Sequence, residues 1–347
     1  MLFYLVKIFV LSILAFVIAI LWTPFLTHFL FKYKLGKKIR DEKRTPIFSS
    51  LHKSKSGTPT LGGVLIWGTT AVLGIVVFYL AKLTNLDIFK HLNFLSRPQT
   101  LLPLGILVVS AVIGAFDDLL NIKGIGPNGG GLKVRYKVLI YTLIAACGAW
   151  WFFSKLEWDI IHLPFFGDYH IGFWYIPLFI FVIVATSFSV NETDGLDGLA
   201  GGVLLIAFAS YAVIAFIQGK FDLAAFCGVI VGALTAFLWF NIYPARFFMG
   251  DTGAMSLGVT LGVIAMLTNT FLFLPLIGFL LVIESISVIA QTASKFFRHK
   301  KIFLSTPLHH HFEAIGWPEP KIVMRFWLIS GMAAIFGLVI FLTESIL

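Results

Sequence analysis

Long apolar runs with almost no charged residues dominate this sequence. A helix needs about 20 mainly apolar residues to cross a hydrocarbon core of roughly 30 Å. We predict a membrane-spanning helix in each of ten runs: 9–31, 62–81, 101–116, 138–153, 173–188, 199–217, 221–239, 255–267, 272–293 and 326–342. The short alternating segments of a barrel are not found in the sequence. The chain is therefore predicted to be an all-α, polytopic membrane protein.

Composition excludes the main alternatives to a membrane protein. Only 12% of the 347 residues are charged and 59% are hydrophobic, whereas a soluble domain carries roughly 25% charged residues. A water-soluble globule could not bury that much apolar surface, and a disordered chain would be more polar. Cys147 and Cys227 both lie in apolar runs, so no disulfide framework is expected. We expect one integral-membrane domain over residues 1–347.

Lysine and arginine are unevenly distributed between the loops on the two sides of the membrane. The loops after the odd-numbered spans hold 20 of the 26 basic residues. Because basic loops stay in the cytoplasm, these loops are predicted to be cytoplasmic and both termini extracytoplasmic. Topology accounts for the net charge of +9, so no nucleic-acid partner is expected.

Acidic residues gather on the same predicted face. Asp117 and Asp118 follow the third span, Asp194 and Asp197 follow the fifth, and Asp251 follows the seventh. The orientation rule counts only lysine and arginine, so this convergence is an independent observation. The sequence therefore predicts an active-site cleft on the cytoplasmic face that is lined by carboxylates.

Two of these acidic motifs suit metal or proton chemistry. Asp117 and Asp118 are adjacent carboxylates, which can share a metal ion, bind a cationic group or supply a general base. Taken alone, the pair is better explained as a solvated helix end. Asp251 lies between Gly250 and Gly253, which let a ligand approach the backbone. Its carboxylate is a hard oxygen ligand of the kind Mg²⁺ prefers, so we predict Asp251 as a metal ligand.

The loop at 191–199 contains two Asp-Gly steps and leads into a helix, whose N-terminal amides favour anions. Its spacing does not fit an EF-hand, and a plain turn is the alternative. Phe247 and Phe248 follow the seventh span and could stack on a base. An interfacial aromatic belt explains either ring equally well.

Basic and imidazole side chains complete the candidate set. Lys55, Thr58 and Thr60 precede the second span, where they could bind phosphate at a helix N-terminus, although they form no P-loop. Three consecutive histidines occupy 309–311. Adjacent histidines rarely bind one zinc ion, so imidazoles beside a pyrophosphate fit better. Glu284 lies within a span, as either a functional carboxylate or one bonded to a neighbouring helix.

These motifs resemble the phospho-N-acetylmuramoyl-pentapeptide transferases, which belong to the polyprenyl-phosphate N-acetylhexosamine-1-phosphate transferases. The resemblance runs along the whole chain. It is carried by segments 58–63, 116–118, 191–200, 240–245 and 249–253, and most specifically by 307–313, 316–322 and 325–327. Asn121 departs from the pattern, since the family usually has lysine there.

The resemblance implies a reaction, a cofactor and partners. Phospho-MurNAc-pentapeptide would pass from UDP-MurNAc-pentapeptide to undecaprenyl phosphate, giving lipid I and UMP in peptidoglycan synthesis. The reaction would need Mg²⁺ and would take place in the lipid bilayer of the bacterial cytoplasmic membrane. A homodimer is left open.

The resemblance also implies residue roles. Asp251 would bind Mg²⁺, Asp117 would deprotonate the lipid phosphate or act as nucleophile, and Asp118 would be its catalytic partner. The implied substrate-binding set is Lys55, Thr58, Thr60, Lys137, Asn191, Asp194, Gly195, Leu196, Asp197, Asn241, Phe248, His309, His310 and His311.

Two other functions are weighed against this one. A sister transferase would use a UDP-N-acetylhexosamine without a peptide, but the motif at 309–313 favours the peptide-bearing donor. A transporter or lipid flippase is the alternative from another class, which ten spans and Glu284 allow. Transporters usually place their site at the bilayer midplane, whereas the acidic motifs here cluster at one face.

Overall fold

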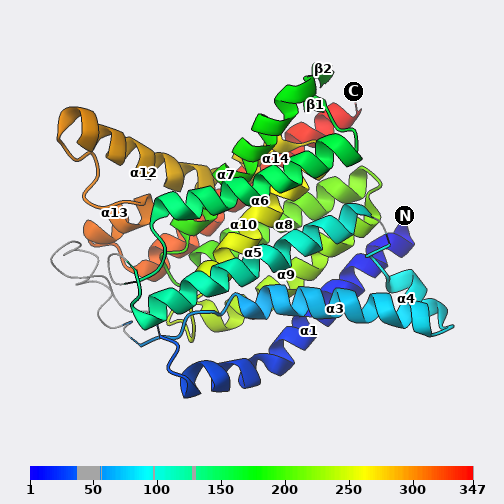
Figure 1. Cartoon of the computed structure of the whole chain (residues 1–347), viewed down its shortest axis with the longest axis horizontal. Helices are drawn as coiled ribbons and strands as arrows, with labels where there is room; N and C mark the ends of the chain where they lie inside the picture. The colour runs from blue at the N-terminus through cyan, green and yellow to red at the C-terminus, as the bar shows by residue number, and fades with distance from the viewer. Residues whose placement is uncertain (37–54, 56, 97, 127–129, 347) are drawn as a thin grey trace.

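A computed structural model describes residues 1–36, 55, 57–96, 98–126 and 130–346. Within those residues ten helices are long and apolar enough to cross a membrane, which confirms the predicted all-α membrane fold. They are α1 (Leu2–Lys32), α3 (Val64–Leu83), α5 (Pro98–Lys123), α6 (Val134–Lys155), α7 (Tyr175–Thr193), α8 (Leu199–Ile217), α9 (Phe221–Asn241), α10 (Gly250–Leu267), α12 (Phe279–Arg298) and α14 (Glu319–Ile346). Figure 1 shows them as one bundle.

The prediction of one continuous span over 272–293 is wrong. The chain forms a short helix η4 (Phe271–Phe273) and then α11 (Leu274–Ile277), and it turns at Gly278 before α12 begins. Pro275 lies in the first turn of α11 and glycine follows its end, which is the usual placement of both residues. The apolar run hides this break because every residue around it is hydrophobic.

The shorter elements were not predicted individually. They are α4 (Asp87–Leu92), the antiparallel hairpin β1 (Ile160–Leu163) and β2 (Gly167–His170), the turn η3 (Gly172–Trp174) and α13 (Leu308–Ala314). The hairpin pairs Ile160 with His170 and Leu163 with Gly167. Among them, α13 carries the three consecutive histidines.

Helix α10 forms the centre of the bundle and is entirely buried. It packs mainly against α5 and α7 (Figure 1). Gly258 makes this packing close, since a Cβ atom there would lie 2.8 Å from Ser187 Cα on α7. Small residues allow such close approach between helices in membranes. The N-terminus of α10, which carries Asp251, is thereby surrounded by other helices on all sides.

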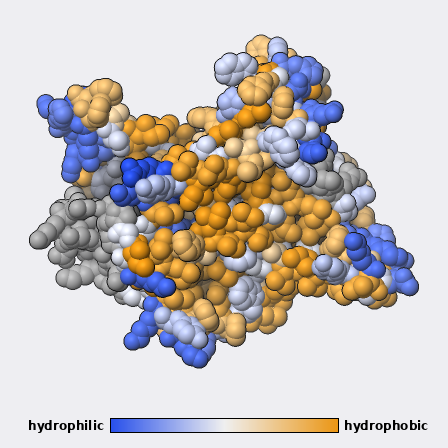
Figure 2. All heavy atoms as spheres, viewed as in Figure 1, coloured by the Kyte–Doolittle hydropathy of each residue, from blue (hydrophilic) through white to orange (hydrophobic). Residues whose placement is uncertain are grey.

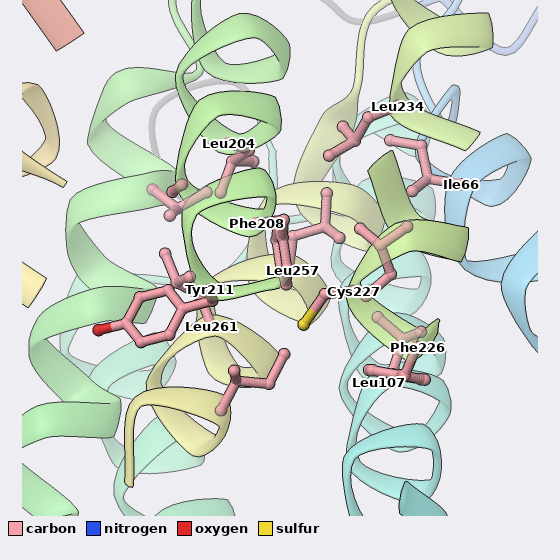
Figure 3. Packing of buried hydrophobic residues seen from close by; sticks show 14 of the residues in the cluster. Ile66, Leu107, Leu204, Phe208, Tyr211, Phe226, Cys227, Leu234, Leu257 and Leu261 are labelled. Carbon is pink, nitrogen blue, oxygen red and sulfur yellow. The ribbon is translucent and has the colours of Figure 1, made fainter. Parts of the chain in front are cut away.

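Helices α8, α9 and α10 share a dense apolar core. In Figure 3 the side chains of Phe208, Cys227 and Leu257 lie together where the three helices meet, and all three are fully buried. On the outside, Figure 2 shows a mainly hydrophobic surface over the helices, with hydrophilic residues gathered at the ends. An apolar exterior of this kind suits contact with lipid.

The two ends of the bundle are chemically different. Both chain termini lie at one end (Figure 1). There Lys7 Nζ contacts Asp222 Oδ1 at 2.8 Å, and His162 Nε2 lies 2.8 Å from Glu344 Oε1. At the opposite end, contacts join described residues that follow odd-numbered spans, among them Lys55 with Asp197 and Lys137 with Asp117. The compartment that each end faces stays a prediction from the basic residues.

Candidate active site

One lysine lies between two of the predicted carboxylates. Lys137, in the first turn of α6, places its Nζ 2.8 Å from Asp117 Oδ2 and 2.8 Å from Asp251 Oδ2. The Asp117 and Asp251 side chains are only 5% and 10% exposed. Charges removed from water to this extent need a close counter-ion. The two carboxylates therefore form one anionic site that is held together by a single ammonium group.

Further donors fix each carboxylate. The Leu132 amide donates to Asp117 Oδ1 at 2.5 Å, and Asn191 Nδ2 donates to Asp251 Oδ1. Asp117 comes from α5, Asn191 from α7, Asp251 from α10 and Lys137 from α6. Residues of four helices thus converge, as expected for residues that follow the third, fifth and seventh spans.

Asp118 has a different position from its neighbour. It is fully buried, and its Oδ1 and Oδ2 accept hydrogen bonds from the Asp251 and Thr252 amides at 3.1 and 3.0 Å. The first amides of a helix have no partner within the helix, and a carboxylate there also interacts favourably with the helix dipole. Asp118 therefore caps the N-terminus of α10 from α5 and fixes the backbone of Asp251.

Segment 58–63 is bonded along the chain that enters α10. The Phe248 amide donates to the Pro59 carbonyl at 2.8 Å, and the Gly62 amide donates to the Phe248 carbonyl at 2.8 Å. The Thr60 hydroxyl donates to Asp118 Oδ1 at 3.4 Å. Thr60 and Phe248 are thus placed beside the acidic cluster.

Gly63 fits against the backbone of Gly253, two residues after Asp251. A Cβ atom on Gly63 would lie 2.3 Å from Gly253 Cα. We expect Gly63→Ala to lower the melting temperature of the purified protein, because overpacking against rigid backbone costs about 1–3 kcal/mol. Gly331→Ala is the matched control, since nothing lies within 4 Å of its Cβ position. Equal melting temperatures for the two variants would contradict this packing.

A second charged cluster lies near the same end. Lys55 Nζ contacts Asp197 Oδ1 at 2.7 Å and Glu319 Oε1 at 2.5 Å. Glu319 also accepts the Asp197 amide at 2.6 Å. Lys55 Nζ lies 5.9 Å from the centre of the Phe248 ring, a cation–π distance. The loop after α7, the segment before α3 and the start of α14 are thereby joined.

Sequence reasoning missed Glu319. The residue lies inside segment 316–322, which carried part of the resemblance, but no role was assigned to it. An acid in the first turn of a helix is usually explained by the helix dipole. The one sequence signal for Glu319 was that it follows an odd-numbered span, as the other carboxylates of the site do.

Asn241 supports the loop that carries Asp197. Its Oδ1 accepts the Gly198 amide at 3.0 Å, and its Nδ2 donates to the Phe247 carbonyl at 2.8 Å. Gly198 has a φ of +81°, a conformation that glycine adopts without strain. Asn241 is buried. Its two hydrogen bonds link the loop before α8 to the segment before α10, so its role in this structure is to hold the two together.

The three histidines have three separate environments. His309 is fully buried, with Nδ1 3.1 Å from Glu284 Oε2. His310 Nδ1 lies 2.6 Å from Glu313 Oε2. His311 Nδ1 accepts the Leu304 amide at 3.3 Å. The rings of His309 and His310 lie 4.1 Å apart, but the three imidazoles contact three different partners.

The remaining predicted residues lie around these clusters. The Thr58 amide donates to the Lys55 carbonyl at 3.2 Å, and Asp194 ends α7. Leu196 is buried, and Gly195 lies against the His309 ring. The structure thus brings the whole predicted set to one end of the bundle, in an acidic cluster around Lys137, a cluster around Lys55 and a histidine region.

The fold and site are those of a membrane-embedded transferase, and comparison with known proteins identifies the class. Residues 100–269 match the glycosyl transferase family 4 profile. The chain is 39% identical to the phospho-N-acetylmuramoyl-pentapeptide-transferase of Chloroflexus aggregans over 93% of this chain and 86% of the relative. It is 38% identical to that of Geobacillus sp. (strain WCH70), over 94% of this chain and 96% of the relative.

A third relative, the phospho-N-acetylmuramoyl-pentapeptide-transferase of Clostridium novyi, is 36% identical and is covered over 94% of both chains. These identities extend over nearly the whole sequence. The chain therefore belongs to the phospho-N-acetylmuramoyl-pentapeptide-transferase family, and the resemblance inferred from the motifs is confirmed.

Proposed function

We propose that the chain transfers phospho-MurNAc-pentapeptide from UDP-MurNAc-pentapeptide to undecaprenyl phosphate, releasing UMP and forming lipid I for peptidoglycan synthesis. Family membership supports the reaction and the two substrates. The Asp117–Lys137–Asp251 cluster at one end of the bundle is the observation that carries the proposal. We place this end at the cytoplasmic face of the bacterial cell membrane, because 20 of the 26 basic residues of the sequence follow the odd-numbered spans.

Phosphoryl transfer depends mainly on positioning and on neutralising charge. In the direct route, an oxygen of the lipid phosphate attacks the β-phosphorus of the UDP-sugar. The bond from that phosphorus to the bridging oxygen breaks, and UMP leaves with the electron pair. Asp117 would accept a proton from the lipid phosphate, and Lys137 would move from the carboxylates toward phosphate oxygens. In the alternative route, Asp117 first forms a phosphoenzyme.

The residues present fit Mg²⁺. Asp117 Oδ2 and Asp251 Oδ2 converge on one ammonium position, and both are hard oxygen donors. Mg²⁺ is commonly held by one or two carboxylates, with waters and substrate phosphates as the other ligands. Among the described residues no group of three or more acidic, histidine or cysteine side chains could hold a metal. Asp251 would hold the ion, with Asp117 Oδ2 as the nearest further carboxylate oxygen, and the remaining ligands would be waters and substrate phosphates. The ion would offset charge on the leaving UMP.

The test supplies purified protein with UDP-MurNAc-pentapeptide, undecaprenyl phosphate and Mg²⁺, and measures UMP and the lipid product. We expect both products in equal amounts. UDP-N-acetylglucosamine in place of UDP-MurNAc-pentapeptide should give no product. Turnover with UDP-N-acetylglucosamine but not with UDP-MurNAc-pentapeptide would identify a sister transferase. Movement of substrate across liposomes without UMP release would identify a transporter and overturn the proposal.

Omitting the lipid acceptor separates the two routes. The direct route predicts no UMP without undecaprenyl phosphate, because attack requires the lipid oxygen. A burst of UMP that matches the amount of protein would instead support the phosphoenzyme on Asp117. Asp117→Asn distinguishes the source of such a burst, since its amide cannot form the acyl phosphate.

Asp118→Asn tests whether Asp118 acts as a cap. The amide keeps one acceptor oxygen but cannot accept from both the Asp251 and Thr252 amides. Loss of a cap costs about 0.5–2 kcal/mol, so we expect a lower melting temperature and roughly tenfold lower turnover. Asp118→Ala should lower both further. A loss beyond about a thousandfold in Asp118→Asn, with an unchanged melting temperature, would instead assign Asp118 to the chemistry.

A further inference from the structure

Glu284 is a buried carboxylate that the proposed reaction does not use. It lies on α12, and its side chain is 0% exposed. A carboxylate within a membrane-spanning segment is costly, so its partners point to its role. Glu284 Oε1 accepts the His309 amide at 3.2 Å, and Oε2 lies 3.1 Å from His309 Nδ1. Both oxygens therefore face one residue, at the start of α13.

His309 also packs against the loop that follows α7. Its ring is fully buried, and a Cβ atom built on Gly195 would lie 2.2 Å from His309 Nε2. Only a residue without a side chain leaves room for the ring. Among the described residues neither ring nitrogen has a hydrogen-bond partner, so Glu284 holds His309 through the backbone amide and through the 3.1 Å contact with Nδ1. The ring is therefore oriented by Glu284 on one edge and by packing against Gly195 on the other.

The contacted loop also carries Asp197, which bonds Lys55 at 2.7 Å. A ring that packs against the Gly195 backbone limits where this loop can lie. Glu284 Oε1 accepts the His309 amide and Oε2 lies 3.1 Å from Nδ1, so Glu284 fixes where His309 lies and the position of the loop depends on Glu284 through His309. The chain of contacts runs from α12 through α13 to the loop.

We propose that Glu284 is a positioning residue, which holds the His309 imidazole so that it supports the 194–197 loop in the conformation that binds the nucleotide part of the donor. This rests on the proposed function, because the nucleotide is the ligand assigned to the loop. Glu284 does not contact the reacting atoms. Its loss should weaken donor binding and leave the chemical step nearly unchanged.

Two substitutions separate geometry from charge. Glu284→Gln keeps an acceptor oxygen for His309, so we expect a KM for the UDP-sugar within about threefold of the parent. Glu284→Leu keeps the bulk and removes both acceptors. Losing a buried partner weakens what it holds, so the KM should rise roughly 10- to 100-fold with kcat within about threefold. Ser294→Ala is the control on the same helix, since Ser294 bonds the Lys300 carbonyl instead.

A double-mutant cycle with His309→Leu then tests whether Glu284 acts through His309. In the His309→Leu background the amide of residue 309 still bonds Glu284, but the ring that packs against Gly195 is gone, so Glu284→Leu should change the KM by less than about twofold. Multiplying effects would overturn the proposal, as would a fall in kcat with an unchanged KM or equal damage from Glu284→Gln and Glu284→Leu. Melting temperatures of the same four proteins should also be non-additive.

The melting cycle needs no substrate. If the protein gave no turnover with any UDP-sugar, non-additive melting temperatures would still show the Glu284–His309 contact. In that case the proposed function would fail and the contact would stand. Additive melting temperatures together with normal turnover would leave the function intact and overturn the positioning role.

Discussion

Asp251→Ala is expected to lower the rate of UMP release by at least about a thousandfold, which corresponds to about 4 kcal/mol of transition-state stabilisation. The carboxylate lies at the start of the buried helix α10 and contacts both Lys137 and Asn191. Removing it takes away one of the two oxygen donors that suit Mg²⁺. Turnover measured against Mg²⁺ concentration is the readout.

The fold should survive this substitution. Asp118 caps α10 through the Asp251 amide, which alanine retains. A melting temperature close to that of the parent would therefore accompany the loss of activity. Asp251→Asn keeps the shape without the charge and should be nearly as inactive. Near-normal turnover with an unchanged Mg²⁺ dependence would remove Asp251 from the metal site.

Lys137→Met should both inactivate and destabilise the protein. The substitution leaves the nearly buried carboxylates of Asp117 and Asp251 without the ammonium that contacts both at 2.8 Å. Breaking a buried pair by removing one partner costs about 3–5 kcal/mol. We expect a clear fall in melting temperature and no measurable turnover. An unchanged melting temperature would contradict the pairing seen here.

A second substitution and added Mg²⁺ should each restore part of the stability that Lys137→Met loses. Asp117→Asn in the Lys137→Met background removes one of the uncompensated charges and should raise the melting temperature again. Mg²⁺ should raise the melting temperature of Lys137→Met more than that of the parent, because it would neutralise the same carboxylates. Ca²⁺-free buffer with added Na⁺ at equal ionic strength is the control for general screening.

The apolar runs predicted the helices well because a membrane leaves the backbone few options. Their ends were less accurate. Helix α14 begins at Glu319, before the predicted start at residue 326, since a helix continues through polar residues beyond the hydrocarbon core. The break at Gly278 was missed because hydropathy does not change across a turn that is itself apolar.

The site was predicted as a set of residues more successfully than as a set of contacts. Asp117 and Asp118 are neighbours in sequence, but adjacent residues on a helix point about 100° apart. One therefore meets Lys137 and the other caps α10. No pattern in the sequence says which does which, since the answer depends on where α10 packs. The pairing of Glu284 with His309 depends in the same way on the fold.

The complete burial of α10 leaves the surrounding lipid no direct contact with the helix that carries Asp251. Bilayer thickness and lateral pressure act on helices that touch lipid, such as α1, α6 and α14, whose apolar windows are only 28% buried. Helix α10 is wholly enclosed, so such forces reach Asp251 through its neighbours, among them Lys137 of α6, which contacts Asp251 at 2.8 Å. Glu319 starts the lipid-facing helix α14 and bonds Lys55. Changes in the surrounding lipid would therefore reach both clusters through one contact each, the Lys55 cluster through Glu319 of α14 and Asp251 through Lys137 of α6.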